Sequence, residues 1–500
     1  MTTPPDSIAR NTGFSLAVRL GSAAFTAGLT LFLVRYLGPD DYGVFALALG
    51  VGLLVLIPSG VGIPQAAARF VADHRGKPDD VAAVIDDALV LRAAVGAGFS
   101  IALAAFAGPI ANAYGSPDLE WPLRIMALAV LGQGMLLLYA SLFEALGRVV
   151  VYLQLGVAES ALEAGASVAF VLLGGGAAGA MWGRAAAYIG VAVLGLALLA
   201  RTVGRRPRPR PLGGRGFMRR IAGYGSALVV VDGAFTLFTK IDVLLIGAIL
   251  SVESVGLFDA PARLIFLLGY AGLAASSGVA PRIIGPDGRP DRQTLESALR
   301  WLIVLQGLAL APLLVWAGPI ADTVLGDDYA KSAAVLRGLA PYALLLAISP
   351  LLAGAVNYLG EARRRVPIAI ATVLLNLAID LALLSPIGIV AGAIGTDVAY
   401  LLYVGAHFRI VKELVGVRLA PLGRTFLRIL AAAGAMAGVL LAFGTSDVSL
   451  PALVAGGALG ILAYAAVLVA MREVSPEELR RASGVLRAAR GRLRAEPGRG

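Results

Sequence analysis

Residues 232–263 read DGAFTLFTKIDVLLIGAILSVESVGLFDAPAR, a long apolar run broken by a short polar turn. The run predicts one membrane-crossing helix, a tight turn and the start of a second helix. Asp232, Lys240, Asp242, Asp259 and Arg263 all lie within it. An ionisable side chain at membrane depth costs at least about 2.5–3.5 kcal/mol, so such residues normally face a bundle interior or a wet cavity. The stretch therefore predicts two helices that line a polar pathway.

The composition of the whole chain is that of a polytopic membrane protein. Its 500 residues are 58% hydrophobic and 15% charged, whereas a soluble domain is about 25% charged. There is no cysteine, and the two histidines, His74 and His407, lie far apart in the sequence. A cysteine metal site is thereby excluded and a histidine site is disfavoured. Because neither a glycine-rich phosphate loop with lysine nor a serine–histidine–acid set is present, we predict no enzyme activity, no metal and no cofactor.

Fourteen apolar runs are long enough to cross about 30 Å of hydrocarbon as helices. They cover residues 13–37, 42–63, 84–111, 122–146, 150–173, 176–201, 219–249, 255–279, 296–320, 333–357, 366–386, 389–411, 425–444 and 449–471. The predicted fold class is therefore an all-α polytopic membrane protein with about fourteen transmembrane helices.

Cations are concentrated in alternate loops. The richest is the arginine–proline stretch from Arg201 to Arg220, while the opposite loops carry acids such as Asp118 and Asp327. Under the positive-inside rule this pattern predicts that both termini lie in the cytoplasm. Topology also accounts for the net charge of +10, so we expect no nucleic-acid partner. The first residues lack a signal-peptide pattern, and we expect the first span to remain in the mature protein.

The sequence repeats on either side of the arginine–proline stretch. Residues 107–112, AGPIAN, recur as 317–322, AGPIAD, and residues 42–45, YGVF, recur as 255–258, VGLF. Two six-helix units that enter from the same side are parallel repeats, related by an axis along the membrane normal. The predicted divisions are an N-terminal six-helix lobe (1–201), a basic linker (202–218), a C-terminal six-helix lobe (219–412), two extra helices (413–471) and a basic tail (472–500).

Two of these stretches resemble a known family. Residues 35–45, RYLGPDDYGVF, are similar to the turn between the first two helices of polysaccharide-type flippases. Residues 240–247 and 255–264 resemble the matching stretch of the second half. These flippases belong to the multidrug, oligosaccharidyl-lipid and polysaccharide exporter superfamily. The resemblance implies a V-shaped pair of six-helix lobes and the movement of a lipid-linked sugar from the inner to the outer leaflet. One departure from the family pattern is Asp259-Ala-Pro261, where relatives more often carry small or aromatic residues.

Moving such a cargo requires cations, because its anionic head must cross a medium in which a bare charge is very costly. Arginine suits phosphate because its planar group donates two hydrogen bonds at once. The predicted substrate-binding residues are Arg19, Lys240, Arg263, Arg92, Arg184 and Asp242. The alternative is structural pairing, above all between Asp259 and Arg263, which are four residues apart on one helix face.

Buried acids suggest a coupling ion. Glu159 and Glu163 are one helical turn apart, and two carboxyl groups so close in a low dielectric tend to share a proton. Asp380 and Asp397 on later helices are a second candidate pair, and Asn376 extends the polar face of Asp380. We predict that these four acids are ion-coupling residues, with pairing of the glutamates to Arg92 or Arg148 as the alternative.

The resulting prediction is a flippase that translocates a polyprenyl-(pyro)phosphate-linked oligosaccharide across the cytoplasmic membrane by alternating access. A cation-coupled multidrug or metabolite antiporter of the same superfamily is the alternative, and a peptidoglycan-precursor flippase is a third possibility. The expected partners are the lipid-linked oligosaccharide, membrane lipids, and glycosyltransferases or a polymerase of the same pathway.

Overall fold

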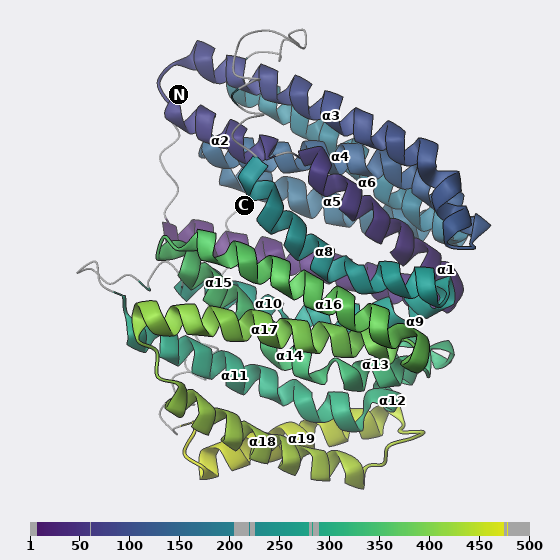
Figure 1. Cartoon of the computed structure of the whole chain (residues 1–500), viewed down its shortest axis with the longest axis vertical. Coiled ribbons are helices and arrows are strands. Elements are labelled where there is room, and N and C mark those ends of the chain that lie inside the picture. The colour runs from purple at the N-terminus through teal and green to yellow at the C-terminus, as the bar shows by residue number, and fades with distance from the viewer. Residues whose placement is uncertain are drawn as a thin grey trace, which may run out of the picture. The chain divides into compact units, whose positions relative to one another are not determined.

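A computed structural model describes residues 8–60, 62–204, 220, 226–279, 283, 290–474 and 478. Nearly all of them are helical (Figure 1), which confirms the predicted all-α class. In these ranges, nine helical stretches are long and apolar enough to cross a membrane by themselves. Two of the nine are more than 50 residues long and contain two predicted spans each. The chain is therefore a multi-pass membrane protein.

The chain divides into two compact units by its internal contacts. Unit 1 comprises Met1–Leu267, Val324–Leu339 and Glu361–Tyr403, and unit 2 comprises Leu268–Thr323, Ala340–Gly360 and Val404–Gly500. These boundaries follow contacts rather than the sequence repeat, and the division into two six-helix lobes stays a prediction. Most of the predicted linker and tail lies outside the described residues.

Unit 1 contains eleven of the helices labelled in Figure 1, of which α9 and α17 continue into unit 2. They are α1 (Ile8–Gly60), α2 (Ile63–Asp73), α3 (Pro78–Ala113), α4 (Glu120–Ala145), α5 (Val149–Phe170), α6 (Gly176–Val203), α8 (Ser226–Ile249), α9 (Val252–Leu268), α13 (Ser332–Gly338), α16 (Arg365–Ile387) and the first half of α17 (Val390–Val415). Short 3-10 or π segments cover Pro117–Leu119, Val171–Gly175, Asp327–Tyr329 and Ala362–Arg364.

Unit 2 contains the remaining helices. They are α10 (Tyr270–Val279), α11 (Arg292–Val315), α12 (Ala317–Ile320), α14 (Ala340–Leu346), α15 (Ile348–Tyr358), the end of α17, α18 (Leu419–Ala442) and α19 (Leu450–Ala470). Asp291 caps α11: its carboxylate accepts hydrogen bonds from the hydroxyl and the backbone N–H of Thr294, which hold its pKa below the usual value. Buried Glu473, just past α19, accepts hydrogen bonds from Thr425 (2.7 Å) and Arg428 (2.6 Å) of α18.

Helix α1 contains the first two predicted spans, and Gly38 divides them. Its backbone has φ 70° and ψ 174°, a conformation that glycine adopts without the steric cost that a Cβ atom brings. Pro39 then begins the second half of the helix, where its missing N–H and fixed φ are tolerated. The short turn predicted between residues 37 and 42 is therefore a sharp bend in one long element.

The repeated motif, YGVF at 42–45 and VGLF at 255–258, brings α1 and α9 into direct contact. A methyl group on Gly43 would overlap the backbone of Val252, and one on Gly256 would overlap the backbone of Pro39. Small residues let membrane helices approach this closely. Gly43 and Gly256 occupy equivalent places in the two sequence repeats. The same motif therefore provides the small residue on each of the two helices where α1 and α9 cross.

Helix α2 is an amphipathic helix that the span prediction did not include. Its buried side contains Ile63, Ala67, Phe70 and Val71, which join the core formed with α3, α4, α5 and α6. The opposite side exposes polar positions such as Gln65. Such a helix, with one apolar and one polar side, covers the end of a helical bundle rather than crossing the membrane.

Candidate functional site

Asp259 on α9 is the centre of a buried ionic cluster in unit 1. The Nε of Arg263 donates to its carboxylate at 2.5 Å, and the hydroxyl of Tyr42 on α1 donates at 2.9 Å. The Nζ of Lys240 on α8 lies 3.9 Å from the same carboxylate. We call Tyr42, Lys240, Asp259 and Arg263 the Asp259 cluster. It contains two cations and one acid, so it has one positive charge in excess.

Arg263 has hydrogen-bonding capacity that the protein does not use. Its Nη2 is buried and has no hydrogen-bond partner among the described residues. The guanidinium lies 5.9 Å from the centre of the Tyr42 ring, close enough for a cation–π contact. Asp259 and Tyr42 therefore fix the orientation of this guanidinium and leave one of its nitrogens without a hydrogen-bond acceptor among the described residues.

Arg184 on α6 is the centre of a second buried network. Its Nη1 donates to Glu163 of α5 at 2.5 Å, and its Nη2 lies 3.2 Å from the Tyr188 hydroxyl and 3.4 Å from Gln133 of α4. Glu159, one turn before Glu163 on α5, accepts a hydrogen bond from Ser160 at 3.3 Å and interacts electrostatically with Glu163 and Arg184. The expected pairing of these glutamates with Arg92 or Arg148 is thus wrong for Glu163, because α6 and not α3 packs along this face of α5.

The two networks are close enough for their charges to interact. Arg263 interacts electrostatically with Glu163, and Lys240 with Arg184. Four of the predicted site residues, Lys240, Arg263, Arg184 and Glu163, are therefore brought together within unit 1. The Nε of Arg184, like Nη2 of Arg263, is buried without a hydrogen-bond partner among the described residues.

A third group, which we call the acid cluster, joins α8, α16 and α17. Asn376 donates to Asp242 at 2.6 Å and to Asp380 at 2.9 Å, and Thr396 donates to Asp242 at 2.6 Å. All four side chains are buried. Asp242 and Asp380 accept hydrogen bonds from the same Asn376 amide nitrogen, and two carboxyl groups so close in a low dielectric tend to share a proton.

The acid cluster offers more oxygen atoms than the protein satisfies. The Oδ1 atoms of Asn376 and Asp380 are buried and have no hydrogen-bond partner in the described parts of the chain. Lys240, two residues before Asp242 on α8, interacts with it electrostatically and forms its ion pair with Asp259 instead. Carboxylate, amide and hydroxyl oxygens in this number suit a proton or a small hard cation.

The other predicted site residues lie elsewhere or are not described. Arg92 is 1% exposed, and it donates to the backbone carbonyls of Gly134 (2.9 Å) and Ser59. It therefore fastens α3 to α4 and to the end of α1. Asp397 is half-buried next to Thr396. The side chains of Arg19 and Asp232 fall outside the described residues.

Sequence reasoning missed the neutral partners of the charged groups. Tyr42, Gln133, Tyr188 and Thr396 all hydrogen-bond to a buried charge. Tyr42, Tyr188 and Thr396 gave a weak signal, since each lies within a segment that recurs in the other half of the chain; for the last two, residues 183–188 (GRAAAY) match residues 395–400 (GTDVAY). A polar uncharged residue in an apolar span carries little information about which distant helix it faces.

A family profile described as polysaccharide biosynthesis protein matches residues 8–283, more than half of the chain. The chain therefore belongs to the polysaccharide biosynthesis protein family. Because the match begins in α1 and ends after α10, it includes the Asp259 cluster and the Arg184 network.

One individual protein extends the similarity over most of the chain, and a second matches about a quarter of it. The probable low-salt glycan biosynthesis flippase Agl15 of Haloferax volcanii is 22% identical over 453 residues, which is 89% of this chain and 92% of the relative. The succinoglycan biosynthesis transport protein ExoT of Rhizobium meliloti is 28% identical over 131 residues, about a quarter of either chain.

Solved structures share the fold at low sequence identity. The lipid II flippase MurJ in an inward closed conformation has a TM-score of 0.78 at 14% identity, covering 92% of this chain and 99% of MurJ. An inward-facing multidrug resistance MATE family transporter has a TM-score of 0.62 at 13% identity, covering 81% of this chain and 98% of the transporter. Together these findings confirm the predicted resemblance to polysaccharide-type flippases: the chain belongs to the polysaccharide biosynthesis protein family and shares the fold of the lipid II flippase MurJ and of a MATE family transporter.

Proposed function

We propose that the protein moves a polyprenyl-phosphate- or polyprenyl-pyrophosphate-linked oligosaccharide from the inner to the outer leaflet of the cytoplasmic membrane by alternating access. The observation that carries this proposal is the Asp259 cluster, with its excess positive charge and its unused buried guanidinium nitrogen. A phosphate that reaches Nη2 of Arg263 gains a charge-assisted hydrogen bond where water is scarce. Both termini then lie in the cytoplasm, as the loop charges predict, and glycosyltransferases or a polymerase are the expected pathway partners.

Each cation would act on the phosphate in a different way. Arg263 is held in one orientation by Asp259 and Tyr42, so its free edge is preorganised for an oxygen atom. Lys240 has a longer contact with Asp259, at 3.9 Å, and its flexible stem can follow a moving charge. Arg184 would extend the positive surface on the α6 side.

The experiment that tests this function uses purified protein in liposomes and a fluorescent polyprenyl-diphosphate oligosaccharide as the probe. We expect the pool in the inner leaflet to become accessible to a membrane-impermeant reductant only when the protein is present. Empty liposomes are the first control. A fluorescent glycerophospholipid is the second, because equal movement of both lipids would indicate unspecific scrambling and contradict the proposal.

A cation-coupled antiporter for drugs or metabolites is the alternative that the acid cluster favours. The acid cluster, in which the buried Oδ1 atoms of Asn376 and Asp380 have no hydrogen-bond partner among the described residues, is the type of site that binds a small cation. Uptake of a fluorescent cationic dye by the same liposomes distinguishes the two functions. Dye transport without movement of the lipid-linked sugar would support the antiporter and overturn the flippase proposal.

We further propose that the acid cluster couples flipping to a proton or sodium gradient. A tenfold cation gradient is worth about 1.4 kcal/mol per ion, which drives up to roughly tenfold asymmetry of the cargo. We expect flipping to respond to an imposed gradient, and we expect Asp380→Asn to remove that response. Asp118→Asn, which changes an acid outside the cluster on an outer loop, should keep it. An unchanged gradient response in Asp380→Asn would show that the ion binds elsewhere.

A further inference from the structure

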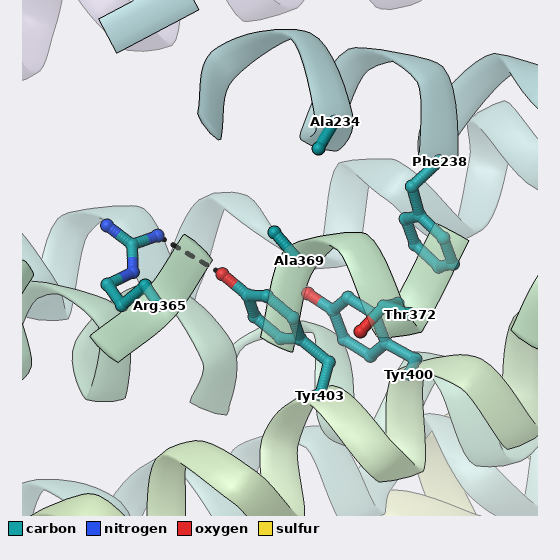
Figure 2. Close-up of a pocket in the computed structure, with 7 residues that line it drawn as sticks. All are labelled: Ala234, Phe238, Arg365, Ala369, Thr372, Tyr400 and Tyr403. Atoms are coloured by element: carbon teal, nitrogen blue, oxygen red, sulfur yellow. Dashed lines mark hydrogen bonds between the residues drawn. The ribbon is translucent and has the colours of Figure 1, made fainter. Parts of the chain in front are cut away.

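A small pocket lies within unit 1 between α8, α16 and α17, and its role is not part of the function proposed above. It is lined by Ala234, Phe238, Arg365, Ala369, Thr372, Tyr400 and Tyr403 (Figure 2). The rings form one continuous stack: Phe238 and Tyr400 have centroids 5.7 Å apart at 13°, and Tyr400 and Tyr403 have centroids 5.8 Å apart at 14°. The three rings are buried, whereas Ala234 and Arg365 at the edge are partly exposed.

The pocket and the acid cluster share three helices in the same register. Phe238 precedes Asp242 by four residues on α8, and Thr372 precedes Asn376 by four residues on α16. Tyr400 follows Thr396 by four residues on α17, which runs in the opposite direction. Residues four apart lie on one helix face about one turn, or 5.4 Å of rise, from each other. The pocket is therefore the layer of side chains directly next to the acid cluster.

The position of Arg365 shows which end of this layer of side chains lies nearer the loop before α16. Arg365 is the first residue of α16 and comes 15 positions before Asp380. It follows Arg363 and Arg364 in a loop that the charge pattern assigns to the cytoplasm. A path from this loop along the inner face of α16 meets Arg365, then Thr372, and then the acid cluster.

The size and chemistry of the pocket select a small occupant. Its volume is about 20 Å³, which is room for roughly one water molecule and far too little for a sugar ring or a prenyl chain. The lining combines aromatic faces, which attract cations, with the hydroxyl groups of Thr372, Tyr400 and Tyr403. Such a lining suits water or a nearly dehydrated monovalent cation.

Arg365 lies at the Tyr403 end of the ring stack, which is the end nearer the start of α16. Its Nη2 donates to the Tyr403 hydroxyl at 3.1 Å, which Figure 2 shows at the edge of the pocket. A fixed guanidinium at a narrow opening is an electrostatic barrier to cations. Movement of Arg365 away from Tyr403 would remove the barrier and release the last ring of the stack.

We propose that this pocket is the cytoplasmic access route by which a proton or sodium ion reaches Asp242 and Asp380, with the rings of Phe238, Tyr400 and Tyr403 as its gate and the Arg365–Tyr403 hydrogen bond as its latch. The proposal rests on the coupling role given to the acid cluster. It adds the direction from which the ion arrives and the residues that control its arrival.

The absence of native cysteine allows a direct test of this route. Thr372→Cys places one thiol in the pocket, and the threonine hydroxyl that it replaces donates to the Ile368 carbonyl of the same helix at 2.8 Å. Silver ion is the probe, because it is a small monovalent cation that bonds to thiols. Leu374→Cys is the matched control, since Leu374 lies two residues further along α16 and is 58% exposed on the outer surface of the helix.

We expect silver added on the side where α16 begins to block Thr372→Cys at least tenfold faster than Leu374→Cys, read as loss of maleimide labelling after denaturation. Adding Arg365→Ala should speed the block severalfold. Equal rates for the two thiols, or a block only from the opposite side, would overturn the proposed route.

Gradient measurements separate this inference from the proposal on which it rests. In the otherwise native chain, Arg365→Ala should weaken the response of flipping to a cation gradient while the acid cluster stays intact. A gradient response with an unreactive Thr372→Cys would refute the route and leave coupling standing. A reactive Thr372→Cys in a protein whose flipping ignores every gradient would support the route and refute coupling.

Discussion

Flipping of the lipid-linked oligosaccharide is expected to fall when Arg263 is replaced by glutamine. Hydrogen bonds to a charged group contribute about 1.5–3 kcal/mol, so the loss should be roughly ten- to a hundredfold. Asp259 keeps Lys240 and Tyr42 as partners in this variant, so the cluster remains neutralised and folded. The measurement is the initial flipping rate of the fluorescent lipid-linked oligosaccharide in liposomes, at equal amounts of folded protein.

A double variant distinguishes a substrate contact from a structural ion pair. Arg263→Gln combined with Asp259→Asn removes one charge of each sign, so the excess charge of the cluster is unchanged. If Arg263 served only to neutralise Asp259, the double variant would regain activity. We expect it to stay as slow as Arg263→Gln alone, because neither change returns a guanidinium to the phosphate.

The chain provides a matched control for this experiment. Glu120 and Arg124 on α4 form an ion pair at 2.5 Å with the same four-residue spacing as Asp259 and Arg263. Their side chains are 36% and 43% exposed. Arg124→Gln should therefore leave flipping within about twofold, because exposed pairs contribute only about 0–1 kcal/mol. A fall as large as that of Arg263→Gln would refute a special role for the Asp259 cluster.

Replacing Gly256 with alanine is expected to destabilise the protein strongly. The new methyl group would overlap the Pro39 backbone, so α1 and α9 would have to separate. Overpacking of this kind typically costs about 1–3 kcal/mol. The measurement is the thermal midpoint of the detergent-solubilised protein by size-exclusion chromatography, which should fall by several degrees or be replaced by aggregation.

Gly190 on α6 gives the opposite prediction for the same chemical change. Apart from its chain neighbours and the backbone of its own helix, no atom of the described residues lies within 4 Å of the position its methyl group would take. Alanine is favoured over glycine in a helix by about 1 kcal/mol, so Gly190→Ala should keep or slightly raise the thermal midpoint. If both variants moved the midpoint equally, the close approach of α1 and α9 would not limit stability.

Local patterns in the sequence predicted most of the fold. Each predicted span overlaps one or more helices, because apolar length is a property of consecutive residues. The structure differs from the prediction where a break in the backbone divides one apolar run into shorter helices. The span predicted over 255–279 is two helices, α9 and α10, that meet at Gly269, and the span over 333–357 is three short helices, α13, α14 and α15.

The candidate site was predictable only where its partners share a helix. The pair Asp259–Arg263 follows from its four-residue spacing. The contact between Tyr42 and Asp259 joins residues 217 positions apart, and that between Glu163 and Arg184 joins residues 21 apart on neighbouring helices. Such pairs depend on how helices rotate against one another, and a single sequence carries little record of that rotation. The aromatic pocket beside the acid cluster escaped prediction for the same reason.

Glu473 has a practical consequence for measuring transport. Its carboxylate joins the end of α19 to Thr425 and Arg428, and Arg300 of α11 lies 4.0 Å away. A dye attached just after α19 would therefore report the position of unit 2 rather than the local motion of a chain end. Paired with a second dye on α4, it would test the proposed alternating access, which predicts a change of energy transfer in each transport cycle.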